Sequence, residues 1–243
     1  MPNVFLEAVV KHLTKVETPS SRSAEQWSEV PVDIRERSLF SARVMNRRHL
    51  QTLKDSIGEM LAPRTEQNED GTFATRGMDL PTARLRIKEM LQSIDYDPGD
   101  KAGTIQDLSS DQRINLQLEQ NSRAAQGFGQ FVQATAPGTI DAYPAQELYR
   151  AEDRVEPRDW EARWQEAGGQ MFGGRMIALK SDGIWEAISR FGVPYPPFDY
   201  NSGMWVRDID RDESEKLGLI SPVEQAVAPD ADFGIDEPEP KLA

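Results

Sequence analysis

The chain has 243 residues, no cysteine and a formal net charge of −13. The lack of cysteine excludes disulfides, zinc knuckles, iron–sulfur clusters and thiol catalysis, and the negative charge excludes indiscriminate coating of nucleic acid. No stretch stays apolar over the about 18 residues that a membrane span requires, so we expect no membrane association.

The first 30 residues are expected to be an N-terminal segment and a linker. The apolar run over residues 4–10 precedes the basic residues Lys11 and Lys15, whereas a secretory signal places its positive charge before the apolar run. We therefore expect a soluble intracellular product. Residues 18–30 are polar and rich in serine, which is typical of a loop or linker.

Residues 31–138 are predicted to be helical, beginning with one long helix. Asp33 and Glu36 form a capping-box pattern at its start, and Pro63 would end it. The apolar positions of this helix, whose later spacings of three and four residues are helical, are Ile34, Phe40, Val44, Leu50, Leu53, Ile57 and Met60.

This predicted helix is basic although the chain as a whole is acidic. Residues 34–54 contain six basic side chains and a single acidic one. Arg43 and Arg47 are four residues apart and would share a helix face, with Arg48 beside them. Two interpretations remain open: a stripe that contacts phosphates or an acidic partner, or a solvated face whose charges pair with carboxylates elsewhere in the fold.

Two further helices are predicted within the helical region. Asp79 is placed to cap the first of them. Ser109 and Gln112 form a capping pattern for the second, which should end at residues 136–138, Ala-Pro-Gly. Residues 64–78 have the composition of a turn.

Residues 139–221 are predicted to form a small mixed α/β region, which makes the fold class α+β. Strands are expected at 147–151 and 175–180, and short helices at 158–167, 184–191 and 210–217. Four of the five tryptophans lie in this region. We interpret its aromatic side chains as a small core rather than as exposed binding anchors.

The last segment, residues 222–243, is predicted to be a disordered acidic tail. It contains six acidic residues, one basic residue and four prolines, with few large apolar side chains. Such a composition cannot bury enough surface to offset the entropy lost on ordering.

The sequence predicts neither a metal site nor a cofactor. His12 and His49 lie in different segments, and neither has a carboxylate or nucleophile placed beside it. His49 lies within the basic stretch and is interpreted as another surface donor. The carboxylates of residues 208–213 lack the glycine and the closing glutamate of a calcium-binding loop.

Three segments carry motif residues in a specific order. Residues 108–129 contain Asn121 and Gly127, and residues 144–160 contain Asp153, Arg154, Val155 and Pro157. Residues 173–210 contain Trp185, Pro196, Pro197 and Asn201, with Arg207 as a late arginine. This order resembles the phage head-morphogenesis, or minor head, proteins of the Mu F type. Many members of that family have a histidine after the second motif and a His–Cys pair in the closing loop. This chain has neither, so the resemblance implies no metal-dependent role.

The resemblance implies a minor capsid component, not an enzyme, in which the motif residues are structural. Such proteins associate with the portal and other capsid proteins and help DNA packaging or ejection, so we expect the protein in the virion and, during assembly, in the host cytoplasm. We expect Arg43, Arg47 and Arg48 to contact the portal or genome DNA. Two alternatives remain open: a hydrolase or transferase with carboxylates and an arginine near Asp153, and an adaptor whose acidic tail docks a basic partner. The sequence gives no oligomeric state.

Overall fold

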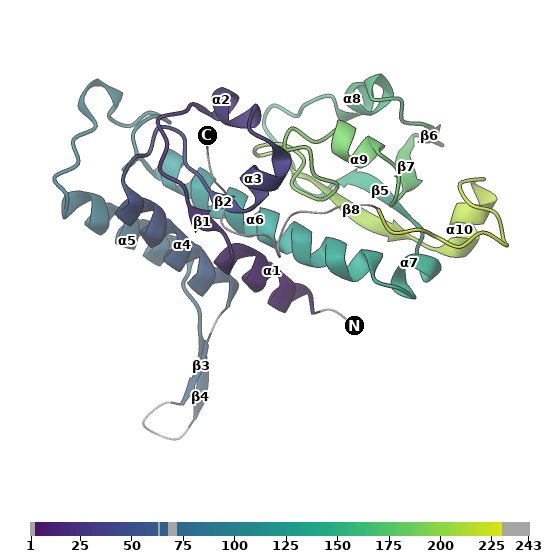
Figure 1. Cartoon of the computed structure of the whole chain (residues 1–243), viewed down its shortest axis with the longest axis horizontal. Coiled ribbons are helices and arrows are strands. Elements are labelled where there is room, and N and C mark those ends of the chain that lie inside the picture. The colour runs from purple at the N-terminus through teal and green to yellow at the C-terminus, as the bar shows by residue number, and fades with distance from the viewer. Residues whose placement is uncertain (1–2, 63, 68–71, 230–243) are drawn as a thin grey trace. The chain divides into compact units, whose positions relative to one another are not determined.

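The computed structural model describes residues 3–62, 64–67 and 72–229 and has an α+β fold, as predicted (Figure 1). The chain divides into two compact units: residues 8–125, the N-terminal unit, and residues 126–229 with 3–7, the C-terminal unit. The division lies within helix α6 (Asp111–Thr135). Among the described helices, none has the length and apolar character needed to cross a membrane.

The core of the N-terminal unit is formed mainly by α4 (Arg47–Leu61), α5 (Leu80–Gln92) and the first part of α6. A 3-10 turn, η1 (Gly99–Lys101), lies between α5 and α6. The least exposed apolar side chains of this core are Leu39, Val44, Leu50, Ile57, Ala83, Ile87, Ile114 and Leu118. Asp79 caps α5 as predicted, because its carboxylate accepts a hydrogen bond from the backbone N–H of Thr82 (2.8 Å). Ser110, one residue after the predicted Ser109, accepts from the N–H of Arg113 at the start of α6.

The prediction of one long helix over residues 33–60 is wrong. A short helix, α3 (Val32–Glu36), is followed by strand β2 (Ser38–Leu39), which pairs in parallel with β1 (Val16–Glu17). The chain then turns, with Arg43 in a left-handed conformation (φ 61°), before α4 begins. The turn lets Leu39 and Val44 both reach the core, and burial outweighs the weak helical pattern between residues 34 and 44.

Residues 18–30 belong to the N-terminal unit and are not a linker. They contain helix α2 (Ala24–Ser28), which begins with a capping box. In it, the Ser23 hydroxyl accepts from the N–H of Gln26 (3.3 Å) and the Gln26 side chain accepts from the N–H of Ser23 (2.9 Å). Trp27 is buried and stacks on Phe40, with 4.1 Å between the ring centroids.

A β-hairpin occupies most of the segment that was predicted to be a turn. Strands β3 (Arg64–Gln67) and β4 (Phe73–Arg76) pair antiparallel. Figure 1 shows this hairpin extending away from the ends of α4 and α5. The turn composition of residues 64–78 thus did not reveal two short strands, because the pairing of one strand with another depends on context beyond local composition.

A four-stranded antiparallel sheet is the centre of the C-terminal unit. Its order is β6 (Met171–Phe172), β7 (Arg175–Leu179), β5 (Ala145–Arg150), β8 (Met204–Ile209). Strands β5 and β7 confirm the strands predicted near 147–151 and 175–180. Strand β8 was not predicted, since its charged residues Arg207 and Asp208 obscure the strand pattern.

One face of this sheet packs on the aromatic core that the sequence predicted. Leu148 of β5 lies in a cluster with Trp160 and Trp164 of α8 (Trp160–Glu166), and with Trp185 of α9 (Ile184–Ala187). Trp164 and Trp185 are fully buried and meet edge to face, with centroids 5.3 Å apart. The interpretation of these aromatics as core is confirmed.

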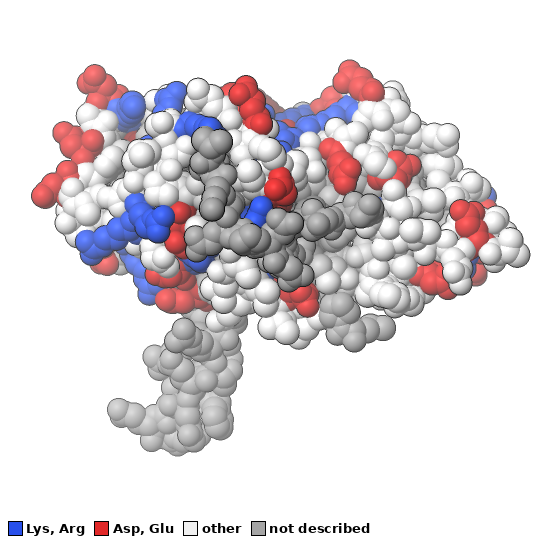
Figure 2. Space-filling view, viewed as in Figure 1, with Lys and Arg blue, Asp and Glu red and all other residues white. Residues whose placement is uncertain are grey.

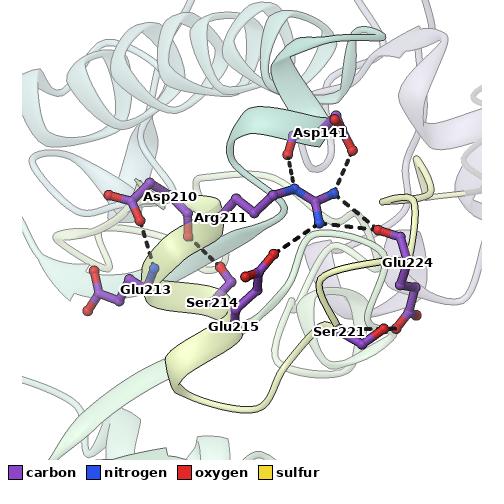
Figure 3. A network of polar contacts seen from close by, with 8 residues as sticks. All are labelled: Asp141, Asp210, Arg211, Glu213, Ser214, Glu215, Ser221 and Glu224. Atoms are coloured by element: carbon purple, nitrogen blue, oxygen red, sulfur yellow. Dashed lines mark hydrogen bonds and ion pairs between the residues drawn. The ribbon is translucent and has the colours of Figure 1, made fainter.

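Helix α10 (Arg211–Lys216) follows β8 and matches the predicted helix at 210–217. Asp210 caps it, and Gly218 follows its end with a positive φ of 74°. Arg211 is the centre of a polar network (Figure 3). Its Nε and Nη2 donate to the carbonyl oxygen and Oδ1 of Asp141 in α7 (Thr139–Ala142), and both terminal nitrogens donate to the carbonyl oxygen of Glu224 (3.2 Å).

Residues 222–229 contain neither helix nor strand. Arg211 fixes their beginning through the Glu224 carbonyl group. The remainder of the predicted disordered tail, residues 230–243, lies outside the described residues.

Candidate functional site

Three exposed arginines surround the start of helix α4. Arg47 and Arg48 are its first two residues, and Asn46 caps it by accepting a hydrogen bond from the N–H of His49 (3.1 Å). Arg43 lies in the preceding turn, where its N–H donates to the carbonyl oxygen of Arg22 (2.9 Å). All three arginine side chains are exposed. The structure thus brings Arg43, Arg47 and Arg48 to one end of α4, and we call them the arginine cluster.

The arginine cluster is not the helical stripe that the sequence predicted. Arg43 is outside the helix, so the expected sharing of a helix face by Arg43 and Arg47 is wrong. The other arginines of the basic stretch have local structural partners. Arg35 donates to the carbonyl oxygen of Val30 (2.7 Å), and Arg37 lies 3.4 Å from the carboxylate of Asp33.

The cluster is electrostatically unfavourable for the helix that carries it. The N-terminus of a helix has a partial positive charge, which favours acidic residues in the first turn. The first turn of α4 has none, and it begins with two arginines.

The nearby carboxylate of Glu17 is paired with Lys54 (2.8 Å). Burial alone would raise the pKa of Glu17, but the hydrogen bond of Lys54 and the charges of Lys54 and Arg47 outweigh burial and lower the pKa.

The first motif of the family resemblance is divided between the two units. Asn121 belongs to the N-terminal unit, and its side chain donates to the carbonyl oxygen of Gln117, one turn earlier in α6 (2.8 Å). Gly127 belongs to the C-terminal unit and packs against the backbone of Pro196. A Cβ at Gly127 would lie 1.8 Å from the Pro196 carbonyl oxygen, so this contact requires glycine.

Most residues of the closing motif are buried in the C-terminal unit. Trp185 is fully buried, and its indole N–H donates to the carbonyl oxygen of Leu179 (2.8 Å). Pro196 and Pro197 are buried as well. Asn201 is exposed and has a left-handed φ of 51°. The buried positions of Trp185, Pro196 and Pro197 indicate that these residues help to pack the closing loop on the sheet.

Asn201→Ala is expected to lower the free energy of unfolding of the C-terminal unit by about 1 kcal/mol, because asparagine tolerates a left-handed backbone better than alanine. Asn201→Gly should match or exceed the wild-type stability, since glycine has no Cβ to strain. Urea unfolding measures both. Equal losses in the two variants would contradict a backbone role and point to the amide side chain.

The residues of the enzyme alternative are partly brought together. The Arg154 guanidinium donates to the carbonyl oxygen of Asn201 (2.9 Å) and to the Glu152 carboxylate (2.6 Å). Its Nη1 also donates to the carbonyl oxygen of Asp153 (3.2 Å). Asp153 and Pro157 are exposed on the same loop. Arg154 therefore clamps this loop to the closing loop, and each of its three nitrogens donates to an oxygen atom.

The sheet also holds an ion cluster that the sequence analysis missed. Glu147 of β5 is buried, and its carboxylate accepts hydrogen bonds from Arg175 of β7 (2.6 and 2.9 Å) and from Arg207 of β8 (2.9 and 3.0 Å). Arg175 also binds Glu213 of α10. Burial alone would raise the pKa of Glu147, but the two arginines outweigh burial and lower the pKa. The sequence did place a charged residue, Glu147, inside a predicted strand, which could have indicated a buried ion pair. Which arginines pair with it depends on the order of the strands in the sheet.

Both histidines are buried, which corrects the interpretation of His49 as a surface donor. His12 is 1% exposed and His49 is 0% exposed. The pKa of each ring is lowered from 6.5 to about 4, and burial is the largest cause. The charge of Arg113 contributes to the lowering at His49. At His12 the charges of Lys15 and Lys54 contribute, against the hydrogen bond with the Lys54 carbonyl group, which raises the pKa.

Among the described residues, no group of three histidine, aspartate or glutamate side chains is arranged to hold a metal ion. No family model matches the chain, and no curated protein or solved structure is significantly similar to it.

Proposed function

We propose that the protein is a minor head-morphogenesis protein of a bacteriophage, which binds the portal and other capsid proteins during assembly and DNA packaging or ejection. It would act in the host cytoplasm during assembly and remain in the virion. The motif order of residues 108–210 supports this proposal, since Gly127, Trp185 and Arg154 have structural roles in the C-terminal unit. A role in assembly requires contact surfaces rather than a reaction.

The observation that carries the proposal is the placement of the arginine cluster. Arg47 and Arg48 oppose the dipole of α4 at its first two positions. A sequence selected for stability alone would favour acidic residues there, by about 0.3–1 kcal/mol per residue. An anionic surface of a partner would offset this cost when it approaches the helix start. We therefore assign the cluster to an acidic surface of the portal protein, with the phosphates of genome DNA as a second ligand of the same charges.

Replacing the cluster by R43E/R47E/R48E should weaken binding to the purified portal protein of the same phage at least tenfold. It should also flatten the salt dependence of the association rate, because long-range attraction between opposite charges is lost. The melting temperature should stay equal or rise, since carboxylates at the first two positions of α4 would then complement the dipole of the helix. Biolayer interferometry at low and moderate salt, with thermal unfolding, measures both effects.

A charge-matched control is K101E/R150E/K216E, which changes the net charge by the same amount at three exposed positions outside the cluster. This control should retain most of the affinity for the portal. Equal losses in both variants would attribute the effect to net charge and contradict the assignment of the cluster. Binding of DNA, but not of the portal, by the wild-type protein would leave genome DNA as the ligand.

A further inference from the structure

Arg43 has a backbone conformation that arginine rarely adopts. Its φ of 61° lies in the left-handed region, where the Cβ of a residue other than glycine is crowded. Glycine would relieve this strain, and asparagine tolerates it better than arginine does. Strained backbone persists only where surrounding contacts impose it, and it is concentrated at functional sites. The surroundings must therefore hold the turn, and we expect the arginine side chain to have a role that glycine cannot fill.

Backbone hydrogen bonds within the N-terminal unit hold the second half of the turn. The N–H of Arg43 donates to the carbonyl oxygen of Arg22 (2.9 Å), and the N–H of Ser20 donates to the carbonyl oxygen of Val44 (2.9 Å). The N–H of Val44 closes the turn on the carbonyl oxygen of Ser41 (3.1 Å). These bonds leave the side chain of Arg43 exposed while they fix its backbone.

Two side chains of α6 hold the first half of the turn. Nη2 of Arg113 donates to the Ser41 hydroxyl group (2.8 Å) and to the carbonyl oxygen of Ala42 (3.0 Å). The side-chain amide of Gln117 also donates to the Ser41 hydroxyl group. Ser41 and Gln117 are buried, and Arg113 is half-buried. A charged donor in partly desolvated surroundings forms a stronger hydrogen bond than a neutral one, so Arg113 supports the turn strongly.

The supported turn determines where Arg43 lies relative to the rest of the arginine cluster. Arg47 and Arg48 are fixed by α4, which Asn46 caps, whereas Arg43 lies before the cap and outside the helix. Without its support the turn would still expose Arg43, but not at a fixed distance from the two helical arginines. Where Figure 1 places α4 and α5, Figure 2 shows basic and acidic side chains interspersed. The arrangement of the three arginines, rather than the total charge, therefore distinguishes the cluster.

We propose that Arg113 is a positioning residue, which holds Arg43 beside Arg47 and Arg48 so that the three guanidinium groups meet one acidic surface of the portal protein together. This inference rests on the proposed function and adds the geometry that the contact requires. A preorganised cluster loses less entropy on binding than three independently moving side chains. Arg113 acts through the turn, because its Nη2 is directed at the turn.

A double-mutant cycle between R113Q and R43A, measured as affinity for the purified portal protein, tests the proposal. In the wild-type background R113Q should weaken binding about fivefold, because the turn loses its support. In the R43A background the same change should weaken binding by about twofold or less, since the side chain that Arg113 positions has already been removed. Equal losses in the two backgrounds would overturn the proposal, because a general structural role or a direct contact of Arg113 with the portal would give that result.

Two further variants make the cycle independent of charge and of folding. R150Q removes one exposed positive charge outside the cluster and should bind within about twofold of the wild type. S41A removes the hydroxyl group that both α6 side chains reach and keeps every charge, so it replaces R113Q should that variant unfold. It should weaken binding in the wild-type background but not in R43A. The salt dependence of its association rate should remain that of the wild type, unlike that of R43E/R47E/R48E.

Failure of this inference and failure of the proposed function give different results. Unchanged affinity of R43A for the portal would overturn the positioning role of Arg113 and leave the contact to Arg47 and Arg48. A complete lack of portal binding by the wild-type protein would overturn both. A loss in R113Q that disappears in R43A, with equal melting temperatures of R43A and R43A/R113Q, would support the inference.

Discussion

Lowering the pH from 7.5 to 5 is expected to destabilise the N-terminal unit by about 4 kcal/mol through His12 and His49. Each ring has a folded-state pKa of about 4 and an unfolded-state pKa of 6.5. The unfolded chain therefore binds more protons as the pH falls, and each ring removes about 2 kcal/mol of stability by pH 5. The loss begins below pH 7 and is complete only below pH 4.

The surroundings of both rings explain why they stay neutral when folded. His12 faces the carbonyl oxygen of Lys54 and the charges of Lys15 and Lys54. His49 faces Arg113, and neither of its ring nitrogens has a hydrogen-bond partner in the described structure. A proton on either ring would add a positive charge to a buried region that already contains at least one.

Urea unfolding at pH 7.5 and 5, followed by the fluorine NMR signal of 5-fluorotryptophan at Trp27, measures the effect in this unit alone. The other four tryptophans lie in the C-terminal unit and serve as an internal reference. In H12Q/H49L most of the pH dependence should disappear, since glutamine can still donate to the Lys54 carbonyl group and leucine fills the site of His49 without titrating. Titration of both rings near pH 6.5 in the folded protein would refute the prediction.

Gly127→Ala is expected to lower the free energy of unfolding of the C-terminal unit by about 3 kcal/mol or more. This is at or beyond the upper end of the destabilisation that overpacked cores usually show. In an open helix the same change stabilises by about 1 kcal/mol. Here the new Cβ would lie 1.8 Å from the carbonyl oxygen of Pro196 and 2.8 Å from its carbonyl carbon. Both are backbone atoms, which cannot rotate away. Either α6 or the closing loop must shift.

Gly58→Ala in α4 is the matched control for Gly127→Ala. A Cβ at Gly58 would meet only Leu13 at 3.5 Å and His12 at 3.9 Å, which are ordinary contacts. This variant should raise the stability of the N-terminal unit by about 0.5–1 kcal/mol. Thermal and urea unfolding of both variants test the difference in sign. A stabilising Gly127→Ala would mean that the loop yields freely and that Gly127 is not required for close packing.

Local chemistry explains which elements could be predicted from the sequence. Helix α5 has its cap, Asp79, and its apolar positions within a few residues of each other, and helix α10 lies between its cap, Asp210, and the closing Gly218. Strand β2 and the turn at Arg43 depend instead on a partner, β1, that is distant in the sequence. A continuous helix over residues 33–60 satisfied the local pattern only in its second half. Tertiary pairing decided the first half.

The same distinction applies to the candidate sites. The exposure of Arg43, Arg47 and Arg48 could be predicted from their charge. Their arrangement could not, because it depends on the turn at Arg43, which no local sequence pattern indicates. The burial of His49 could not be predicted, because a basic neighbourhood in the sequence normally indicates solvent. The orientation of helix α1 (Val4–Leu13) was equally hard to predict, since the contacts of Lys11 and His12 show which side lies inside.

The order of the strands has a consequence for synthesis of the chain on the ribosome. Strand β5 lies at the centre of the sheet, yet its neighbour β8 is made more than 50 residues later. Until residues 204–209 emerge, β5 has an unpaired edge, and buried Glu147 lacks the two hydrogen bonds of Arg207. The N-terminal unit can form well before that moment, because its main elements end at residue 125. We therefore expect nascent chains that stall between β7 and β8 to be captured by chaperones or to aggregate through the edge of β5.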